Sequence, residues 1–223
     1  MNRAKVLSLL FALALVLFLL TAAISLPIYA RGFYYAHIDA LELPALTGRS
    51  KEEIREAYDQ VLDYLTKPGR EFGTGVFPYS QDGAAHFADC KVLFDLNRNV
   101  LILSCSLLAA LLLLRKLGKT AAYRLGKRSA AFWAAIVALV LPIVVGCLAA
   151  LNFDRAFVIF HSLFFPGKDN WIFDWHADAI IQVLPQDFFM HCALLIGVGL
   201  LTMSLLVLFL DRILEKAPGK KDS

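Results

Sequence analysis

The chain alternates between long apolar stretches and stretches that carry most of its charge. A helix that crosses about 30 Å of hydrocarbon needs about 20 mostly apolar residues. Four stretches meet this requirement, at residues 6–29, 92–114, 130–151 and 190–210. Each is expected to be helical, because lipid offers no hydrogen-bond partner to an open strand. The pattern predicts an all-α membrane protein, a four-transmembrane-helix bundle with a small extracytoplasmic cap.

The first apolar stretch has two interpretations. Arg3 and Lys5 give it the short basic start of a secretory signal peptide. The apolar stretch of residues 6–29 is, however, longer than the 7–15 residues usual for such a peptide, and no small-residue cleavage site is obvious near Tyr29–Gly32. We therefore expect a retained membrane helix.

Charge is distributed unequally between the stretches that separate the predicted spans. Residues 1–5, 115–129 and 211–223 hold 12 of the 22 Lys and Arg residues but only 3 of the 19 Asp and Glu residues. Short loops rich in Lys and Arg remain in the cytoplasm. We therefore place these three segments inside, and residues 30–91 and 152–189 outside. The basic 115–129 loop also has the composition of a lipid or nucleic-acid site, but the topological explanation suffices and predicts no nucleic-acid partner.

Composition agrees with this class, since 59% of residues are hydrophobic, against about 45–50% in soluble domains. The four cysteines are Cys90, Cys105, Cys147 and Cys192. No pair has the C-x-x-C spacing of a metal site, and Cys90 is the only one placed clearly outside the membrane. We expect no metal and no extracytoplasmic disulfide framework.

The first outer segment contains a clear helix signal. Residues Ser50 to Glu53 fit a capping box. Ile54, Tyr58 and Leu62 then recur at helical spacing, and Pro68 with Gly69 marks the end of the helix. A further helix, capped by Asp82, is expected to run directly into the second span.

The second span has an uninterrupted apolar run of only 15 residues, Val100–Leu114. To cross the hydrocarbon it must also use residues from about Val92, which brings Asp95 and Arg98 to the outer leaflet. Ionisable residues at that depth tend to face a bundle interior or a wet cavity. They are equally compatible with a span that ends in polar residues at the headgroups.

The second outer segment, 152–189, is short and aromatic. Its density of Phe and Trp is typical of a segment at the membrane interface. Pro166-Gly167 predicts a turn, Asp174 or a neighbour can begin a short helix, and Pro185 suits the first turn of the last span.

Candidate chemistry is limited to histidines, because the chain lacks G-x-S-x-G, H-E-x-x-H and a phosphate loop. All five histidines fall in or beside the two outer segments: His37, His86, His161, His176 and His191. We single out His86 and His161, which lie on different outer segments and are expected to meet at the mouth of the bundle. Asp82 and Asp89 lie one helical turn from His86, close enough to orient its imidazole, and Asp174 and Asp178 follow His161.

Two sequence blocks resemble a known family. One is His86-Phe-Ala-Asp89-Cys-Lys91. The other runs from Phe160-His161 through Trp171-Ile-Phe-Asp174 and Leu184-Pro185 to Phe189. Together they resemble the Lit family of bacterial lipoprotein intramolecular transacylases, over nearly the whole chain. One departure is Ser80–Gly83, where the family tends to carry a charged cluster before its first histidine.

The resemblance implies an acyl shift within one substrate, from the sn-2 ester of a diacylglyceryl-cysteine to the α-amine of that cysteine. The expected partners are the diacylated lipoprotein N-terminus and membrane lipids, in the bacterial cell membrane, with no cofactor. One of His86 and His161 would be the general base, and the other would orient the ester or stabilise the oxyanion. Cys90 as an acylated nucleophile is a lesser alternative.

We assign substrate-positioning roles to residues that accompany the two histidines in sequence. They are Asp89, Lys91, Arg98, Trp171 and Asp174, with Arg98 included because it can bind lipid phosphate. The competing interpretation of the chain is a non-enzymatic membrane assembly factor or sensor with an extracytoplasmic domain.

Overall fold

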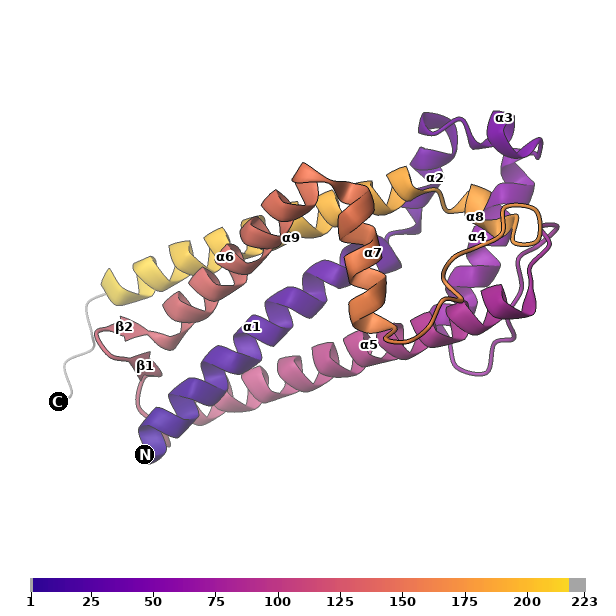
Figure 1. Ribbon diagram of the computed structural model, residues 1–223. Helices are drawn as coiled ribbons and strands as arrows, with labels where there is room; N and C mark the ends of the chain where they lie inside the picture. Colours follow the sequence, from indigo (N-terminus) through magenta and orange to yellow (C-terminus); the bar gives the residue numbers. More distant parts are fainter. Residues whose placement is uncertain (1, 217–223) are drawn as a thin grey trace. The chain divides into compact units, whose positions relative to one another are not determined.

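The computed structural model describes residues 2–216, so the last part of the predicted 211–223 tail lies outside the described residues. The elements, in chain order, are α1 (Arg3–Tyr29), α2 (Arg31–Ala40), α3 (Leu43–Thr47), α4 (Lys51–Thr66), α5 (Gln81–Lys116), β1 (Arg124–Leu125), β2 (Arg128–Ser129), α6 (Ala130–Leu151), α7 (Phe153–Phe164), α8 (Ile180–Val183) and α9 (Gln186–Lys216) (Figure 1). Apart from the two short strands β1 and β2, every regular element in residues 2–216 is a helix.

Three of these helices, α1, α5 and α9, are long and apolar enough to cross a membrane. In α5 the apolar part is the second half, whereas the first half carries polar and charged residues up to Arg98 and Asn99. Helix α6 adds a shorter apolar stretch, Ala130–Val144. The predicted all-helical membrane class is thus confirmed, while the count of four crossings stays a prediction.

The chain divides into two compact units. We call residues 1–24, 99–145 and 196–223 the span unit, and residues 25–98 and 146–195 the histidine unit. All five histidines belong to the second.

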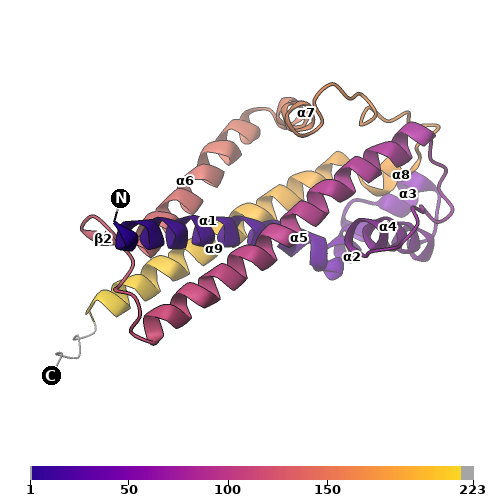
Figure 2. The same cartoon turned by 90° about the horizontal axis from the view of Figure 1, so that it is seen from below.

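In the span unit, small residues allow close helix packing. Ala130, Ala134 and Ala138 recur every four residues on one face of α6 and are fully buried. The β1–β2 hairpin of the basic loop is fastened to α1, because the backbone N–H of Arg124 donates to Ser8 Oγ at 3.1 Å. Figures 1 and 2 both show the hairpin beside the N-terminal end of α1.

In the histidine unit, α4 forms as the sequence predicts. The Ser50 side chain accepts from the Glu53 backbone, and the Glu53 carboxylate accepts in return from Ser50 N–H at 2.8 Å. The apolar face of α4 is buried, and its Tyr58 ring stacks on Tyr34 of α2 with ring centroids 3.6 Å apart. Tyr34 also donates to the carbonyl of Val183 at 2.7 Å, which ties α2 to α8.

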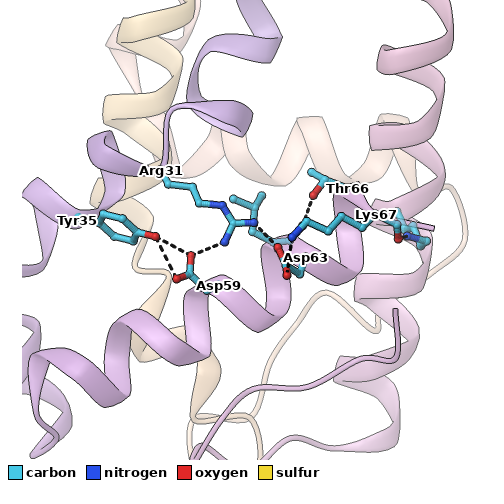
Figure 3. Close-up of polar contacts among 8 residues, drawn as sticks. Arg31, Tyr35, Asp59, Asp63, Thr66 and Lys67 are labelled. Carbon is cyan, nitrogen blue, oxygen red and sulfur yellow. Dashed lines mark hydrogen bonds and ion pairs between the residues drawn. The ribbon is translucent and has the colours of Figure 1, made fainter. Parts of the chain in front are cut away.

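An ion-pair cluster joins the start of α2 to the outer face of α4. Arg31 lies between Asp59 and Asp63 and contacts both carboxylates (Figure 3). Tyr35 donates to Asp59 at 2.8 Å, and Lys67 binds Asp63 at 2.8 Å. Because α2 follows α1 after one residue, the cluster fixes where the chain leaves the first predicted span.

Residues 153–164 form the helix α7, for which no prediction was made, and Asn152 caps it by accepting from Arg155 N at 2.9 Å. Two local predictions are wrong. No helix begins at Asp174, where the carboxylate instead accepts from His176 N–H in a turn. Helix α5 is capped by Ser80, whose hydroxyl accepts from Gly83 N at 2.9 Å, and not by Asp82.

Candidate active site

Two buried imidazoles from different helices form the candidate site. His86 lies in the second turn of α5, and His161 lies in the last turn of α7. Their ring centroids are 5.6 Å apart, with 34° between the ring planes. The side chains are 5% and 6% exposed, respectively. The predicted convergence of His86 and His161 therefore occurs within the histidine unit.

Aromatic rings surround the pair. Trp171 stacks on His161, with centroids 4.6 Å apart and an interplanar angle of 26°. Phe165 and Phe173 present their edges to His86 at 5.0 and 5.5 Å. Such surroundings exclude water and favour the neutral form of each imidazole.

Hydrogen bonding distinguishes the two rings. His161 Nδ1 lies 2.8 Å from the carbonyl oxygen of Phe157, one turn earlier in α7. A carbonyl only accepts, so Nδ1 carries the proton and Nε2 keeps its lone pair. His86 Nε2 lies 3.4 Å from Cys90 Sγ, whereas its buried Nδ1 has no hydrogen-bond partner among the described residues. Each ring thus has one nitrogen without a hydrogen-bond partner among the described residues.

The expected pairing of His86 with Asp89 is wrong. Asp89 accepts from Lys168 and, at 3.1 Å, from Asn170 Nδ2. Asp178, which follows His161 in sequence, accepts from the backbone N–H and hydroxyl of Ser80 at 2.7 and 3.0 Å. Helical spacing placed Asp89 near His86, but Lys168 competes for the carboxylate with a full positive charge.

Burial also sets the protonation states of the site. It lowers the pKa of His86 to about 4, with a further contribution from the nearby His161. It lowers the pKa of His161 as well. Burial raises the pKa of Cys90 to about 12, so its thiol is neutral at physiological pH. The hydrogen bond from Lys168 lowers the pKa of Asp89, which stays ionised. The imidazoles are therefore neutral while their neighbouring ion pair is charged.

The loop between α7 and α8 carries Trp171 and Phe173 and runs back to the first turns of α5 (Figure 2). One fastening is the contact of Lys168 and Asn170 with Asp89, and the other is the contact of Asp178 with Ser80. These fastenings lie on either side of His86 in sequence. Sequence reasoning missed Lys168, Asn170 and Ser80, because no local pattern marks partners that are 79–98 residues apart.

The family model of the lipoprotein intramolecular transacylase Lit matches residues 9–189. This chain belongs to the Lit family. A solved structure of the membrane integral transacylase Lit from Bacillus cereus is 29% identical, with a TM-score of 0.86 and 96% of each chain covered.

Two variants of the Bacillus cereus protein, in which one histidine is replaced by arginine or by alanine, have also been solved. Each has a TM-score of 0.80 and 27% identity, covering 96% of this chain and 92% or 94% of the other. No curated protein matches the chain.

Membership of the Lit family makes this chain a membrane acyltransferase that carries out intramolecular acyl transfer in lipoproteins. The alternative of a non-enzymatic assembly factor or sensor is thereby wrong. The resemblance of the two histidine blocks is confirmed, whereas the role of each residue within them stays a prediction.

Three residues that were assigned to substrate positioning have other partners in this Lit-family chain. Lys91 contacts the carbonyls of Tyr64 and Lys67 at the end of α4. Arg98 pairs with Asp95 at 3.0 Å. Asp174 shapes its own turn. Of the five residues assigned to substrate positioning, only Trp171 contacts a site histidine directly, and Asp89 binds the α7–α8 loop.

The Lit-family chain contains a second histidine pair in the same unit. His37 Nε2 lies 3.0 Å from His191 Nδ1, and His37 Nδ1 lies 2.7 Å from the Phe33 carbonyl. Since that carbonyl requires a proton on His37 Nδ1, His191 Nδ1–H must be the donor between the rings. This pair ties α2 to α9 and leaves fewer free ring nitrogens than the His86–His161 pair.

Proposed function

We propose that His161 and His86 together move the sn-2 acyl chain of a diacylglyceryl-cysteine to the α-amine of the same cysteine. The observation that carries this proposal is the pair of neutral, buried imidazoles, each with one ring nitrogen available. Donor and acceptor are tethered in one substrate. Positioning alone therefore supplies a large part of the acceleration.

His161 is the general base in this mechanism. Its Nδ1–H is held by the Phe157 carbonyl, so the Nε2 lone pair is free to accept a proton. The lowered pKa keeps His161 unprotonated at neutral pH, as a base must be. Trp171, stacked on the ring, holds its plane.

His86 donates a hydrogen bond to the developing oxyanion through Nδ1. This atom is buried, and no described residue satisfies it. A preorganised donor in a site that excludes water stabilises negative charge that forms in the transition state. With a pKa of about 4, His86 donates as a neutral imidazole.

The steps balance without a co-reactant. The neutral α-amine attacks the ester carbonyl carbon, forming the C–N bond, and its proton passes to His161 Nε2. The resulting oxyanion collapses and breaks the C–O bond at sn-2. His161 returns the proton to the leaving alkoxide. The products are an N-acyl chain and a free sn-2 hydroxyl, which together define the lyso-form lipoprotein.

We also propose the topology in which this reaction occurs. The chain crosses the bacterial cell membrane four times, with both termini in the cytoplasm and residues 30–91 and 152–189 on the extracytoplasmic side. Supporting observations are the excess of Lys and Arg in residues 1–5, 115–129 and 211–223 and the apolar stretch of α6. The site then lies at the outer face, where the diacylated N-terminus is anchored.

The test is mass spectrometry of a lipoprotein N-terminal peptide from a host that lacks this modification. Expression of the chain should yield the N-acyl lyso-form. His161→Ala should lower its formation by about 10²–10⁴-fold, and His86→Ala by about 10²–10³-fold. His176→Ala, an exposed histidine, is the matched control and should be unchanged. Full activity in His161→Ala would refute its assignment as the base.

A further inference from the structure

Cys90 contacts the one ring nitrogen of His86 that the proposed mechanism does not use. Its Sγ lies 3.4 Å from His86 Nε2, one turn further along α5. The opposite nitrogen, Nδ1, is buried and has no partner among the described residues, on a side chain only 5% exposed. A neutral imidazole carries a single proton, and the contact with the thiol influences which nitrogen holds it.

Two arrangements satisfy the contact. Either the thiol S–H donates to the Nε2 lone pair, which leaves the proton on Nδ1, or Nε2–H donates to sulfur, which leaves Nδ1 as a lone pair. Sulfur is a weak acceptor, whereas the imidazole lone pair is a strong one. A buried thiol also remains protonated and able to donate. The first arrangement is therefore the more stable.

We infer that Cys90 is a positioning residue that fixes His86 in the tautomer with the proton on Nδ1. This inference rests on the proposed function, in which His86 Nδ1–H stabilises the oxyanion. The alternative tautomer would present a lone pair to negative charge and repel it. The thiol thereby determines whether His86 helps or hinders the acyl transfer.

The same geometry gives Cys90 no nucleophilic role. An attacking sulfur must be a thiolate, and the neutral His86 holds the thiol without removing its proton. Acyl transfer through a thioester would make activity depend completely on the sulfur. A positioning role would make it depend only partly on Cys90.

The direct test is ¹⁵N NMR of the full chain in detergent micelles, with labelled histidine, at pH 7. His86 should show a protonated Nδ1 and an unprotonated Nε2. In Cys90→Val, which removes the donor at similar volume, the shifts should move toward a mixture of tautomers. In Cys90→Ser the hydroxyl donates in place of the thiol, and the wild-type shifts should return. A protonated Nε2 in the wild type would overturn the inference.

Kinetics give an independent readout. Cys90→Val should lower kcat about threefold to tenfold, the usual effect of losing one net hydrogen bond, with KM unchanged because the oxyanion exists only in the transition state. Cys90→Ser should recover activity to within about twofold. Cys105→Val, at an exposed cysteine of the span unit, is the control.

The outcomes separate this inference from the proposed function. Suppose that His161→Ala loses activity and that the wild type carries the His86 proton on Nε2. The tautomer assignment is then overturned, while His161 remains the general base. A loss beyond about a hundredfold in both Cys90 variants would indicate a nucleophile and overturn the positioning role. Unchanged kcat and shifts in Cys90→Val would also overturn it.

Discussion

At the scale of single residues, the site depends on two histidines, His86 and His161, that have no carboxylate hydrogen-bonded to them among the described residues. Burial lowers the pKa of His86 by more than the charge of nearby Asp89 raises it. The sequence predicted the pair of histidines, because each lies in an outer segment beside a span. It did not predict their partners. Helical spacing shows that Asp89 is near His86, but it does not show that Lys168, on a distant loop, binds the carboxylate instead.

Neutral imidazoles have a consequence for the pH dependence of the reaction. The substrate α-amine, with a pKa of about 7.7–8.0, must be deprotonated to attack. His161 must also be deprotonated, but burial lowers its pKa below the ordinary value of about 6.5. Log kcat/KM should therefore rise with a slope of one up to about pH 7.7, and steepen to two only below about pH 6.5.

The measurement is the rate of N-acyl product formation on a synthetic diacylated peptide across pH 5–9. With a peptide whose α-amine has a lower pKa, the upper break in the pH profile should move to lower pH. The lower break, which reports His161, should stay in place. A slope of two already at pH 7 would contradict the lowered pKa of His161.

At the scale of elements, the loop between α7 and α8 needs close approach to α5. A Cβ built on Gly83 would lie 2.2 Å from Asp178 Oδ1 and 3.3 Å from the Phe173 ring. Asp178 is buried and bound to Ser80, so it has little room to move. Gly83 is thus required by the loop that carries Trp171 and Phe173.

Gly83→Ala should displace this loop and lower transacylase activity about tenfold or more, since small misplacements near a site are costly. The assay is the same product analysis by mass spectrometry. Gly32→Ala, at a helical glycine with no atom within 4 Å of the added Cβ, is the matched control and should retain activity. Equal activities in the two variants would show that the loop tolerates the methyl group.

The ion-pair cluster at Arg31 contributes stability instead of chemistry. Arg31→Gln leaves Asp59 and Asp63 without their shared cation, although Tyr35 and Lys67 still bind them (Figure 3). Because these carboxylates are partly exposed, we expect a loss of about 1–2 kcal/mol in the free energy of unfolding. Thermal unfolding of the full chain in detergent measures it.

Arg49→Gln provides the comparison. Arg49 pairs with Glu53 at 3.6 Å on the surface, and an exposed pair of this kind contributes about 0–0.5 kcal/mol. A Tm for Arg31→Gln no lower than that of Arg49→Gln would mean that the cluster does not hold α2 on α4.

Elements differ in how far the sequence determines them. Helix α4 was predicted because its capping box and apolar spacing are local signals. Helix α7 was not, because Phe157–Phe160 forms a run of apolar residues with no polar alternation to reveal a helical period. The fastening of the α7–α8 loop was also missed, since it depends on pairs such as Ser80 with Asp178 that only the folded chain brings together.

At the scale of the whole molecule, the proposed topology is open to a direct test. Single cysteines at exposed positions 52, 127 and 187 replace Glu52, Lys127 and Asp187 in a background in which all four native cysteines are replaced by serine. A membrane-impermeant thiol reagent applied to intact cells should label the first and third positions. It should label the second only after the cells are opened.

The labelling pattern distinguishes the four-span topology from topologies with fewer crossings. Opposite labelling of positions 52 and 127 requires that α5 crosses the membrane, and opposite labelling of 127 and 187 requires that α6 crosses as well. Labelling of all three positions from outside would refute the four-span topology, and inverted labelling would refute the orientation inferred from charge.

The absence of charge on the two imidazoles affects how the rate depends on ionic strength and on lipid composition. Coulomb interactions at a membrane surface vary with ionic strength and with the share of anionic lipid. A base and an oxyanion donor that are both neutral before reaction present no net charge for these fields to act on. We therefore expect the rate constant for the deprotonated substrate to be nearly indifferent to salt and to headgroup composition, so that lipid remodelling acts on the reaction mainly through the protonation of the substrate α-amine.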